Sequence, residues 1–211
     1  MKVTLILMAL TIWATQVLGQ TKLSCLSANH KIRGYFYAGT AIHDSLALGG
    51  FWASPNALKA LHDIDHQPGK LSIQVIKDDT SVFYTEDGRK WKGVSVLVIN
   101  GSNSLIEFSA QDSRLDMVCE VFYEQRWQEI EYLPSSWCGN SYHTVYLGKN
   151  QYWRFVAPCY TGDTHVKLRF KLNVAKNQIA YSNEIEASFN PRSLTKQQGH
   201  KRKNLMDPYD N

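Results

Sequence analysis

The segment Val166-Lys167-Leu168-Arg169-Phe170-Lys171-Leu172 alternates apolar and basic residues without a break. A β-strand points successive side chains to opposite faces, so this pattern predicts a strand with one buried face and one solvated face. The same period of two recurs where Leu71, Ile73 and Val75 alternate with their neighbours. Because apolar residues recur every two positions rather than every three or four, we expect strands rather than helices over most of the chain.

Other short segments rich in β-branched and aromatic residues are separated by turn residues. They span residues 31–37, 81–84, 92–99, 104–108, 115–123, 127–132, 142–147, 152–156 and 178–181. Strands do not alternate with helical patterns along the chain, which argues against a parallel sheet. The sequence therefore predicts an all-β fold, an antiparallel β-sandwich or barrel.

One short helix is expected near the N-terminus, over residues 54–64. Ser54 is placed to cap it, and Pro55 occupies the first helical position, where proline is tolerated. Apolar residues follow at helical spacing, at Leu58, Leu61 and Ile64.

The first residues have the layout of an export signal. Lys2 supplies one positive charge, an apolar run extends from Val3 to Trp13, and Gly19 fits the position before a cleavage site. The run is too short for a membrane span, which needs roughly 20 residues. We expect residues 1–19 to be a signal peptide and the mature protein to be secreted and extracellular, with no membrane span.

The charge of the chain is unevenly distributed. The total is +4, but residues 20–191 carry 17 basic and 17 acidic side chains, so the tail over residues 192–211 holds the basic excess of the mature chain. A nucleic-acid-binding domain would carry that excess on its folded part, so we expect no nucleic-acid partner. We expect a disulfide-stabilised β-rich domain over residues 20–191 and a disordered basic tail. The tail is open to three interpretations: a polyanion contact, a dibasic processing site or a solvated terminus.

Four cysteines follow the expected cleavage site: Cys25, Cys119, Cys138 and Cys159. An even number of cysteines in an exported chain indicates two disulfides, and three pairings are open. We favour Cys138–Cys159 with Cys25–Cys119. No two cysteines have the close spacing of a zinc site, and we expect neither a metal nor a cofactor.

Asn100-Gly101-Ser102 carries two signals at once. It is a sequon for N-glycosylation, and Asn-Gly between two apolar runs is typical of a tight β-hairpin turn. The two are compatible because a hairpin tip is exposed. We expect Asn100 to be glycosylated at the tip of a hairpin formed by residues 96–99 and 105–108.

Two stretches of the chain share a pattern: an aromatic strand end, a charged turn and a tryptophan that opens the next strand. One is Val82-Phe83-Tyr84 with Trp91-Lys92-Gly93-Val94, and the other is Val121-Phe122-Tyr123 with Trp127-Gln128-Glu129-Ile130. The pattern resembles hairpins in starch- and glycogen-binding sandwich modules, although the asparagine-rich ligand stretch of those modules is absent here. The alternative is a pair of hairpins that pack tryptophan into a core.

The histidine-rich segment His62-Asp63-Ile64-Asp65-His66 is the most suggestive cluster for a metal. Histidines four residues apart share a helix face, but a metalloprotease needs glutamate directly after the first histidine. We therefore interpret these histidines as structural or solvent-exposed.

No pattern in the chain predicts a catalytic residue, and we expect the protein not to be an enzyme. A Gly-x-Ser-x-Gly nucleophile turn is absent. Glu129 and Glu131 would share one strand face, as a glycosidase pair requires, but such residues are usually the solvent side of a strand. An enzyme would need a pocket that unites groups such as His43, Asp44, His62 and His66.

Aromatic side chains are the remaining functional signal, with 6 Trp, 11 Tyr and 8 Phe. The region around Trp137, Tyr152 and Trp153 is dense enough that we expect some of these rings to be exposed and to bind a ligand. The sequence favours a structural or adhesive component of an extracellular matrix whose partner is a matrix protein or a polysaccharide. The alternative is a carbohydrate-binding, lectin-like module. A planar row of exposed aromatic rings would favour sugar binding, and a scattered distribution would favour the matrix role.

Overall fold

The computed structural model describes residues 22–27, 32, 34–47, 49, 52–62, 64–78, 80–136, 138–174 and 178–194. The predicted signal peptide and residues 195–211 of the predicted tail lie outside this described part, so both stay predictions. Within the described part, no helix has the length and apolar character needed to cross a membrane.

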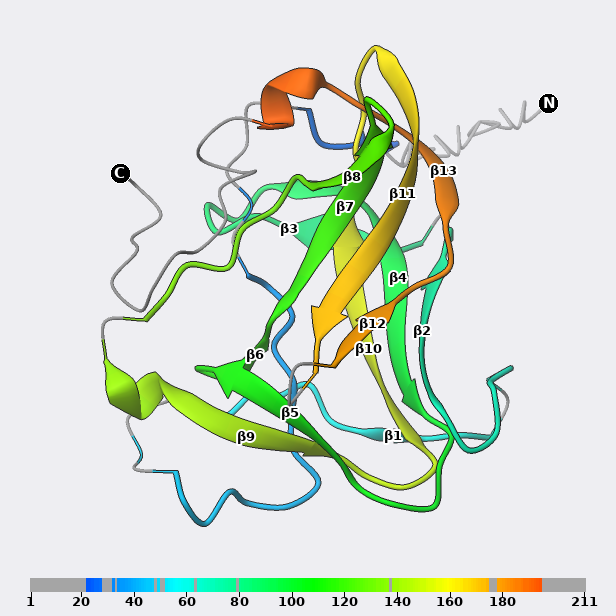
Figure 1. Cartoon of the computed structure of the whole chain (residues 1–211). Helices are drawn as coiled ribbons and strands as arrows, with labels where there is room; N and C mark the ends of the chain where they lie inside the picture. Colours follow the sequence, from blue (N-terminus) through cyan, green and yellow to red (C-terminus); the bar gives the residue numbers. More distant parts are fainter. Residues whose placement is uncertain are drawn as a thin grey trace, which may run out of the picture.

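The fold is all-β, as predicted, with antiparallel strands in three sheets (Figure 1). The first sheet has the order β1-β10-β4-β2, with β3 also paired to β4: β1 (Lys59–Ala60), β10 (Gln151–Pro158), β4 (Lys90–Asn100), β2 (Leu71–Ile76) and β3 (Val82–Tyr84). The second has the order β12-β11-β7-β8, with β13 also paired to β11: β12 (Ile179–Tyr181), β11 (Thr164–Asn173), β7 (Met117–Tyr123), β8 (Arg126–Glu129) and β13 (Ile185–Phe189). The third is β6-β5-β9: β6 (Arg114–Leu115), β5 (Ile106–Gln111) and β9 (Tyr142–Leu147).

The core lies between the first two sheets, and Figure 1 shows β7 and β11 in front of β10 and β4. The ring of Phe36, from the N-terminal segment, is 5.4 Å from that of Phe155 in β10 and 5.7 Å from that of Phe170 in β11. Phe108 of β5 lies 5.2 Å from Trp153 of β10, which joins the third sheet to the same core. In β11 the residues Val166, Leu168, Phe170 and Leu172 are buried, whereas the alternate residues are not, which confirms the pattern read from the sequence.

The helix expected over residues 54–64 is wrong, because the described residues there form no helix and include β1. The helix elements of the described chain are two short 3-10 turns, η1 (Gly139–Ser141) and η2 (Pro191–Leu194). The backbone of residues 54–64 bonds to distant segments instead: Gly39 donates to the carbonyl of Asn56, and Leu61 donates to that of Asn150. Pairing along the edge of β10 thus replaces the hydrogen bonds that a helix would have made.

The hairpin expected around Asn100-Gly101 is also wrong. β4 and β5 are not neighbours, because β4 pairs with β10 and β2 while β5 pairs with β6 and β9. The strand expected over residues 31–37 is reduced to an isolated bridge between Tyr37 and Arg114, and residues 28–31 and 33 lie outside the described part.

The chain contains a Cys25–Cys159 disulfide, so the pairing that we favoured is wrong. Leu26 forms a parallel bridge with Tyr160, which places Cys25 beside Cys159. Cys119 lies on the buried face of β7 and Cys138 is exposed next to η1, and both are free thiols. One disulfide is consistent with an oxidising compartment.

Candidate functional surface

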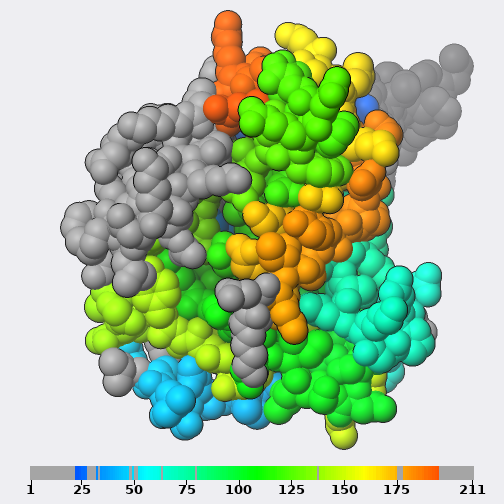
Figure 2. Space-filling model, viewed as in Figure 1, coloured from blue at the N-terminus to red at the C-terminus, as the bar shows by residue number. Residues whose placement is uncertain are grey.

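The outer face of the second sheet carries three of the five large hydrophobic side chains that are exposed on the described strands. We call it the aromatic face and define it by Phe122 of β7, Trp127 of β8, Arg169 of β11, and Ile179 and Tyr181 of β12. Phe122 is 42% exposed, Ile179 50% and Tyr181 45%. Figure 2 shows β7, β11 and β12 next to one another on one side of the molecule.

Strand register brings these residues together. Phe122 lies opposite Trp127 in the β7–β8 pair, and their ring centroids are 5.4 Å apart. Arg169 is an outward residue of β11, and its guanidinium carbon lies 3.9 Å from the ring centroid of Trp127 and 3.9 Å from that of Tyr181. A guanidinium held between two aromatic rings gains a cation–π attraction from each of them. The three side chains therefore hold one another in place across β8, β11 and β12.

Each described cation on the outer side of β11 beside this group has a carboxylate partner. Arg169 Nη2 lies 2.9 Å from Glu120 Oε2, and Lys171 Nζ lies 2.8 Å from Glu129 Oε1. Hydrogen bonding to Glu129 and its charge raise the pKa of Lys171 against the opposing effect of burial. A surface whose charges are already balanced has little attraction for a polyanion, whereas aromatic rings with arginine are typical of protein interfaces.

The two hairpins predicted from their shared pattern are present, in two different settings. Phe83 lies opposite Trp91 in the β3–β4 pair, as Phe122 lies opposite Trp127. Trp91 packs against the hydrophobic core, whereas Trp127 stacks on Arg169 at the surface. The β3–β4 hairpin thus packs its tryptophan against the core, which was the alternative interpretation. The β7–β8 hairpin presents its tryptophan on the aromatic face.

The three aromatic residues predicted to bind a ligand do not form one surface. Trp153 is fully buried, and its Nε1 donates to the carbonyl of Gly39 at 2.9 Å, so the exposure expected for it is wrong. It is buried because it takes an inward position of β10, together with Phe155 and Ala157. Tyr152 takes an outward position and is half-buried, and Trp137 lies outside the described part.

The carboxylates considered as a catalytic pair are also separated. β8 ends at Glu129, which remains on the outer face, whereas Glu131 enters the core. Glu131 accepts hydrogen bonds from the hydroxyls of Tyr35 at 2.8 Å and Tyr160 at 2.6 Å. The shared strand face expected for the two glutamates is therefore wrong, and they do not flank a common cleft.

The histidine segment makes local contacts. His66 Nδ1 lies 2.8 Å from the carbonyl of Ile64, and Asp63 lies outside the described part. Among the described residues, no group of three or more His, Cys, Asp or Glu side chains is arranged to hold a metal.

The exposure expected for the sequon is wrong, because Asn100 is fully buried. Its Nδ2 donates to the carbonyls of Ser104 at 2.7 Å, Leu147 at 3.1 Å and Gly148 at 3.0 Å. A glycan attached to this nitrogen would displace these bonds. Glycosylation of Asn100 stays a prediction, and this geometry weighs against it once the chain has folded.

Hollows open between the described elements, and two of them have the volume of a small-molecule site. One, of about 540 Å³, lies beside the disulfide and is lined by Lys77, Asp78, Lys92 and His165 among others. The other, of about 320 Å³, unites His43 and Asp44 with Ser113 and His143. The second hollow joins two of the four residues that an enzyme pocket would have required, but His62 and His66 do not line it.

Sequence reasoning missed two residues that the structure makes prominent. Tyr181 was seen only as the end of a strand, and its contact with Arg169 depends on the β11–β12 register. Trp52 was not singled out, yet it is 85% exposed beside the 320 Å³ hollow, where its neighbours Ala53 and Ser54 form part of the lining. Its position in an irregular segment gave no periodic signal.

The comparisons with known proteins add no relative. No family model, no curated protein and no solved structure matches the chain.

Proposed function

We propose that this protein is a secreted, non-enzymatic structural or adhesive component of an extracellular matrix, and that the aromatic face is its contact surface. The observation that carries the proposal is the stacking of Arg169 between Trp127 and Tyr181 beside the exposed Phe122. Tryptophan, tyrosine and arginine are the residues that most often dominate binding energy at protein interfaces. The Cys25–Cys159 disulfide supports an extracellular setting.

The state of the aromatic face before binding also supports an adhesive role. Arg169 and Lys171 are held by Glu120, Glu129 and the neighbouring rings, so little side-chain freedom remains to be lost on association. Ordering of rotamer-rich side chains is one of the main costs of binding, and a preorganised face avoids much of it. Phe122 and Ile179 then supply apolar surface that a partner would bury.

The exposed apolar residues beyond this face are scattered. They lie in the N-terminal segment (Tyr37, Ile42, Leu46 and Trp52), on β2 (Ile76) and β3 (Tyr84), and after β4 (Leu105). A scattered distribution favours several surface contacts, as in matrix assembly, over one planar sugar platform. The carbohydrate-binding alternative also loses Trp153 as a ligand residue.

Solid-phase binding of the purified, disulfide-intact chain to collagen, laminin and fibronectin surfaces tests the proposal, with self-association followed by sedimentation velocity. We expect binding or self-association, and we expect the double variant Phe122→Ser/Tyr181→Ser to weaken it by roughly tenfold or more. Tyr84→Ser is the control, because Tyr84 is more exposed, at 58%, than either residue of the double variant but lies on β3 of the first sheet.

The control should bind within about twofold of the parent protein, since most surface contacts away from the anchor residues are nearly neutral. Binding that survives the double variant unchanged would remove the aromatic face from the proposal. A chain that neither binds these surfaces nor self-associates would overturn the adhesive role.

A further inference from the structure

The 320 Å³ hollow has the composition of a small polar-ligand site. We call it the Trp52 pocket and define it by Asp44, Ser54, Ser113, His143 and Thr144 in its lining. Trp52 adjoins this lining in two ways: its chain neighbour Ala53 is a lining residue, and its carbonyl accepts a hydrogen bond from Ser113. The N-terminal segment forms one side, and Ser113 of the β5–β6 turn forms the other together with β9. Ala38 and Val145 supply apolar surface between the polar groups. Its volume is at the lower end of the range typical of small-molecule pockets.

We propose that the Trp52 pocket binds a neutral sugar unit, with the ring of Trp52 against the apolar face of the sugar and Asp44 accepting a hydrogen bond from one of its hydroxyls. This site is separate from the aromatic face and does not depend on the adhesive role proposed above.

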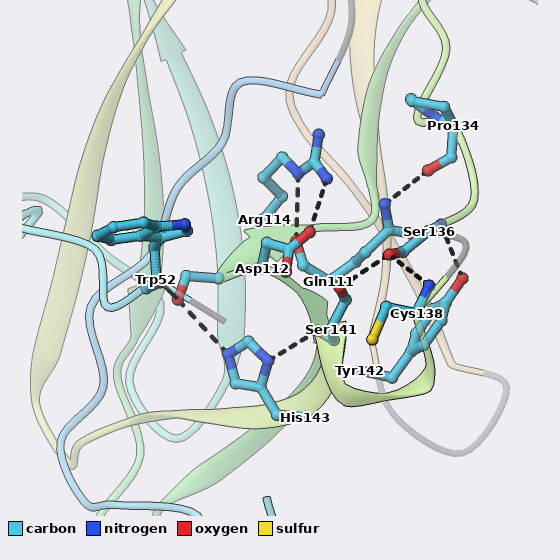
Figure 3. A network of polar contacts seen from close by, with 11 residues as sticks. Trp52, Gln111, Asp112, Arg114, Pro134, Ser136, Cys138, Ser141, Tyr142 and His143 are labelled. Carbon is cyan, nitrogen blue, oxygen red and sulfur yellow. Dashed lines mark hydrogen bonds and ion pairs between the residues drawn. The ribbon is translucent and has the colours of Figure 1, made fainter. Parts of the chain in front are cut away.

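Trp52 is fixed at its backbone while its ring is exposed. Ser113 Oγ donates to the carbonyl of Trp52 at 2.7 Å, which ties the residue to the turn between β5 and β6. Figure 3 shows Trp52 and His143 in the same network of polar contacts. An aromatic ring that is 85% exposed on a fixed backbone presents a flat apolar surface to a ligand at little further cost in ordering.

Asp44 is the anchor for hydroxyl groups. It is only 8% exposed, and its two carboxylate oxygens accept from the backbone of Leu46 at 2.9 Å and of Thr144 at 2.7 Å. These backbone bonds, the one from Thr144 most strongly, lower its pKa against the effect of burial, so the group is ionised at neutral pH. The side chain of Thr144 also hydrogen-bonds to this carboxylate, which leaves it the capacity to accept from one ligand hydroxyl.

The rest of the lining supplies both donors and acceptors. Ser54 Oγ accepts from the backbone of Asn56 at 3.1 Å, which leaves its hydroxyl hydrogen able to donate to a ligand. His143 Nδ1 lies 3.1 Å from the carbonyl of Ser141, which fixes the ring at the pocket wall. Sugar hydroxyls both donate and accept, so this mixed lining suits them. The charge of Asp44 disfavours an acidic sugar, which is why the proposal specifies a neutral one.

The same residues do not have the geometry of a serine hydrolase. Ser113 Oγ lies 3.5 Å from His143 Nε2 and is committed to the carbonyl of Trp52. Asp44 is held by Leu46 and Thr144, while His143 Nδ1 faces a carbonyl rather than a carboxylate. A nucleophilic serine needs its base at hydrogen-bond distance and a base oriented by its partner. Binding therefore fits this pocket better than covalent catalysis.

Isothermal titration of the full disulfide-intact chain with soluble oligosaccharides of glucose, mannose and N-acetylglucosamine tests the proposal. We expect one of these series to bind, and Trp52→Ala and Asp44→Asn each to weaken it by roughly tenfold or more. Tyr84→Ala, an exposed ring remote from the pocket in sequence and sheet, should leave the affinity unchanged. Circular dichroism confirms folding, and Ser54→Ala is a milder variant should Asp44→Asn unfold.

The proposal would be overturned if none of the three series bound. It would also be overturned if Trp52→Ala and Asp44→Asn both kept the affinity of the parent protein. Turnover of a p-nitrophenyl ester that is lost in Ser113→Ala, without sugar binding, would overturn it in favour of a hydrolase. The double variant Phe122→Ser/Tyr181→Ser should leave the sugar affinity unchanged. The sugar titration therefore tests the Trp52 pocket independently of the adhesive role proposed for the aromatic face.

Discussion

At the scale of single residues, Glu131 links the two sheets to the N-terminal segment through a buried carboxyl group. It accepts from the hydroxyls of Tyr35 and Tyr160 and from the backbone of Cys119 at 2.9 Å. Burial raises its pKa to about 7, even though these three hydrogen bonds act in the opposite direction. In the unfolded chain the same group would ionise near its ordinary value of 4.5.

The raised pKa predicts that the stability of the folded state falls as pH rises. Below pH 4.5 both states hold the proton, so the contribution of Glu131 is fully present there. Between about pH 4.5 and 7 only the unfolded state releases the proton, and stability on the order of 3 kcal/mol is lost. Urea unfolding at pH 5 and pH 8 measures the loss, which should largely disappear in Glu131→Gln.

Other titrating carboxylates act in a different range. Hydrogen bonds from Ser95 and Ser81 lower the pKa of Asp78 to about 2 against the effect of burial, so its contribution is lost only below about pH 4. Glu129→Gln, on the outer face, is the matched control for removal of a glutamate charge and should still lose stability between pH 5 and pH 8, because Glu131 is retained. An equal pH dependence in the parent and in Glu131→Gln would contradict the role given to Glu131.

At the scale of elements, β11 separates a buried face from a solvated one within one strand. Phe170→Ala should reduce the free energy of unfolding by about 3–5 kcal/mol, because Phe170 is fully buried against Phe36. Lys167→Ala, three residues away on the outer side, should change it by less than about 1 kcal/mol, since its ion pair with Glu184 is exposed. Denaturant unfolding of both variants measures the contrast, and similar losses would contradict the assigned faces.

The strands that could be predicted are those whose own side chains alternate or are strongly β-forming. β9 matches its expected range at both ends, β2 contains the predicted alternation of Leu71, Ile73 and Val75, and β11 begins two residues before the alternating segment 166–172 and ends one residue after it. The helix predicted over residues 54–64 was wrong because helical spacing reports only a local preference. In the folded chain, the edge of β10 offers backbone hydrogen-bond partners to this segment, and β1 forms there instead. β13 was not predicted, because its apolar residues Ile185 and Phe189 are separated by mostly polar or small ones.

At the scale of the whole molecule, the candidate sites depend on contacts between distant segments. The alternation of residues 166–172 was enough to place Arg169 on an outer face, and the hairpin pattern was enough to place Trp127 at the start of β8. Their contact with Tyr181, and the meeting of Asp44 with Thr144, join segments far apart in the sequence. No local pattern specifies such contacts, since they follow from the packing of the sheets.

The disulfide is the strongest whole-molecule constraint, because it joins residues separated by 134 positions and ties the N-terminal segment to the end of β10. The double variant Cys25→Ser/Cys159→Ser should lose about 3–5 kcal/mol of stability, as expected for a loop of this length. Reduction of the parent protein should produce a similar loss in denaturant unfolding.

Thiol titration tests the same pairing without a variant. Cys138 is exposed and should react in the native protein, giving one equivalent. Burial raises the pKa of Cys119, with Glu131 adding to the effect, so its thiol should react only after unfolding, giving two equivalents in denaturant. Cys138→Ser should abolish the native reaction and leave one equivalent in denaturant. A chain without reactive thiols in denaturant would contradict the assignment of Cys119 and Cys138 as free thiols.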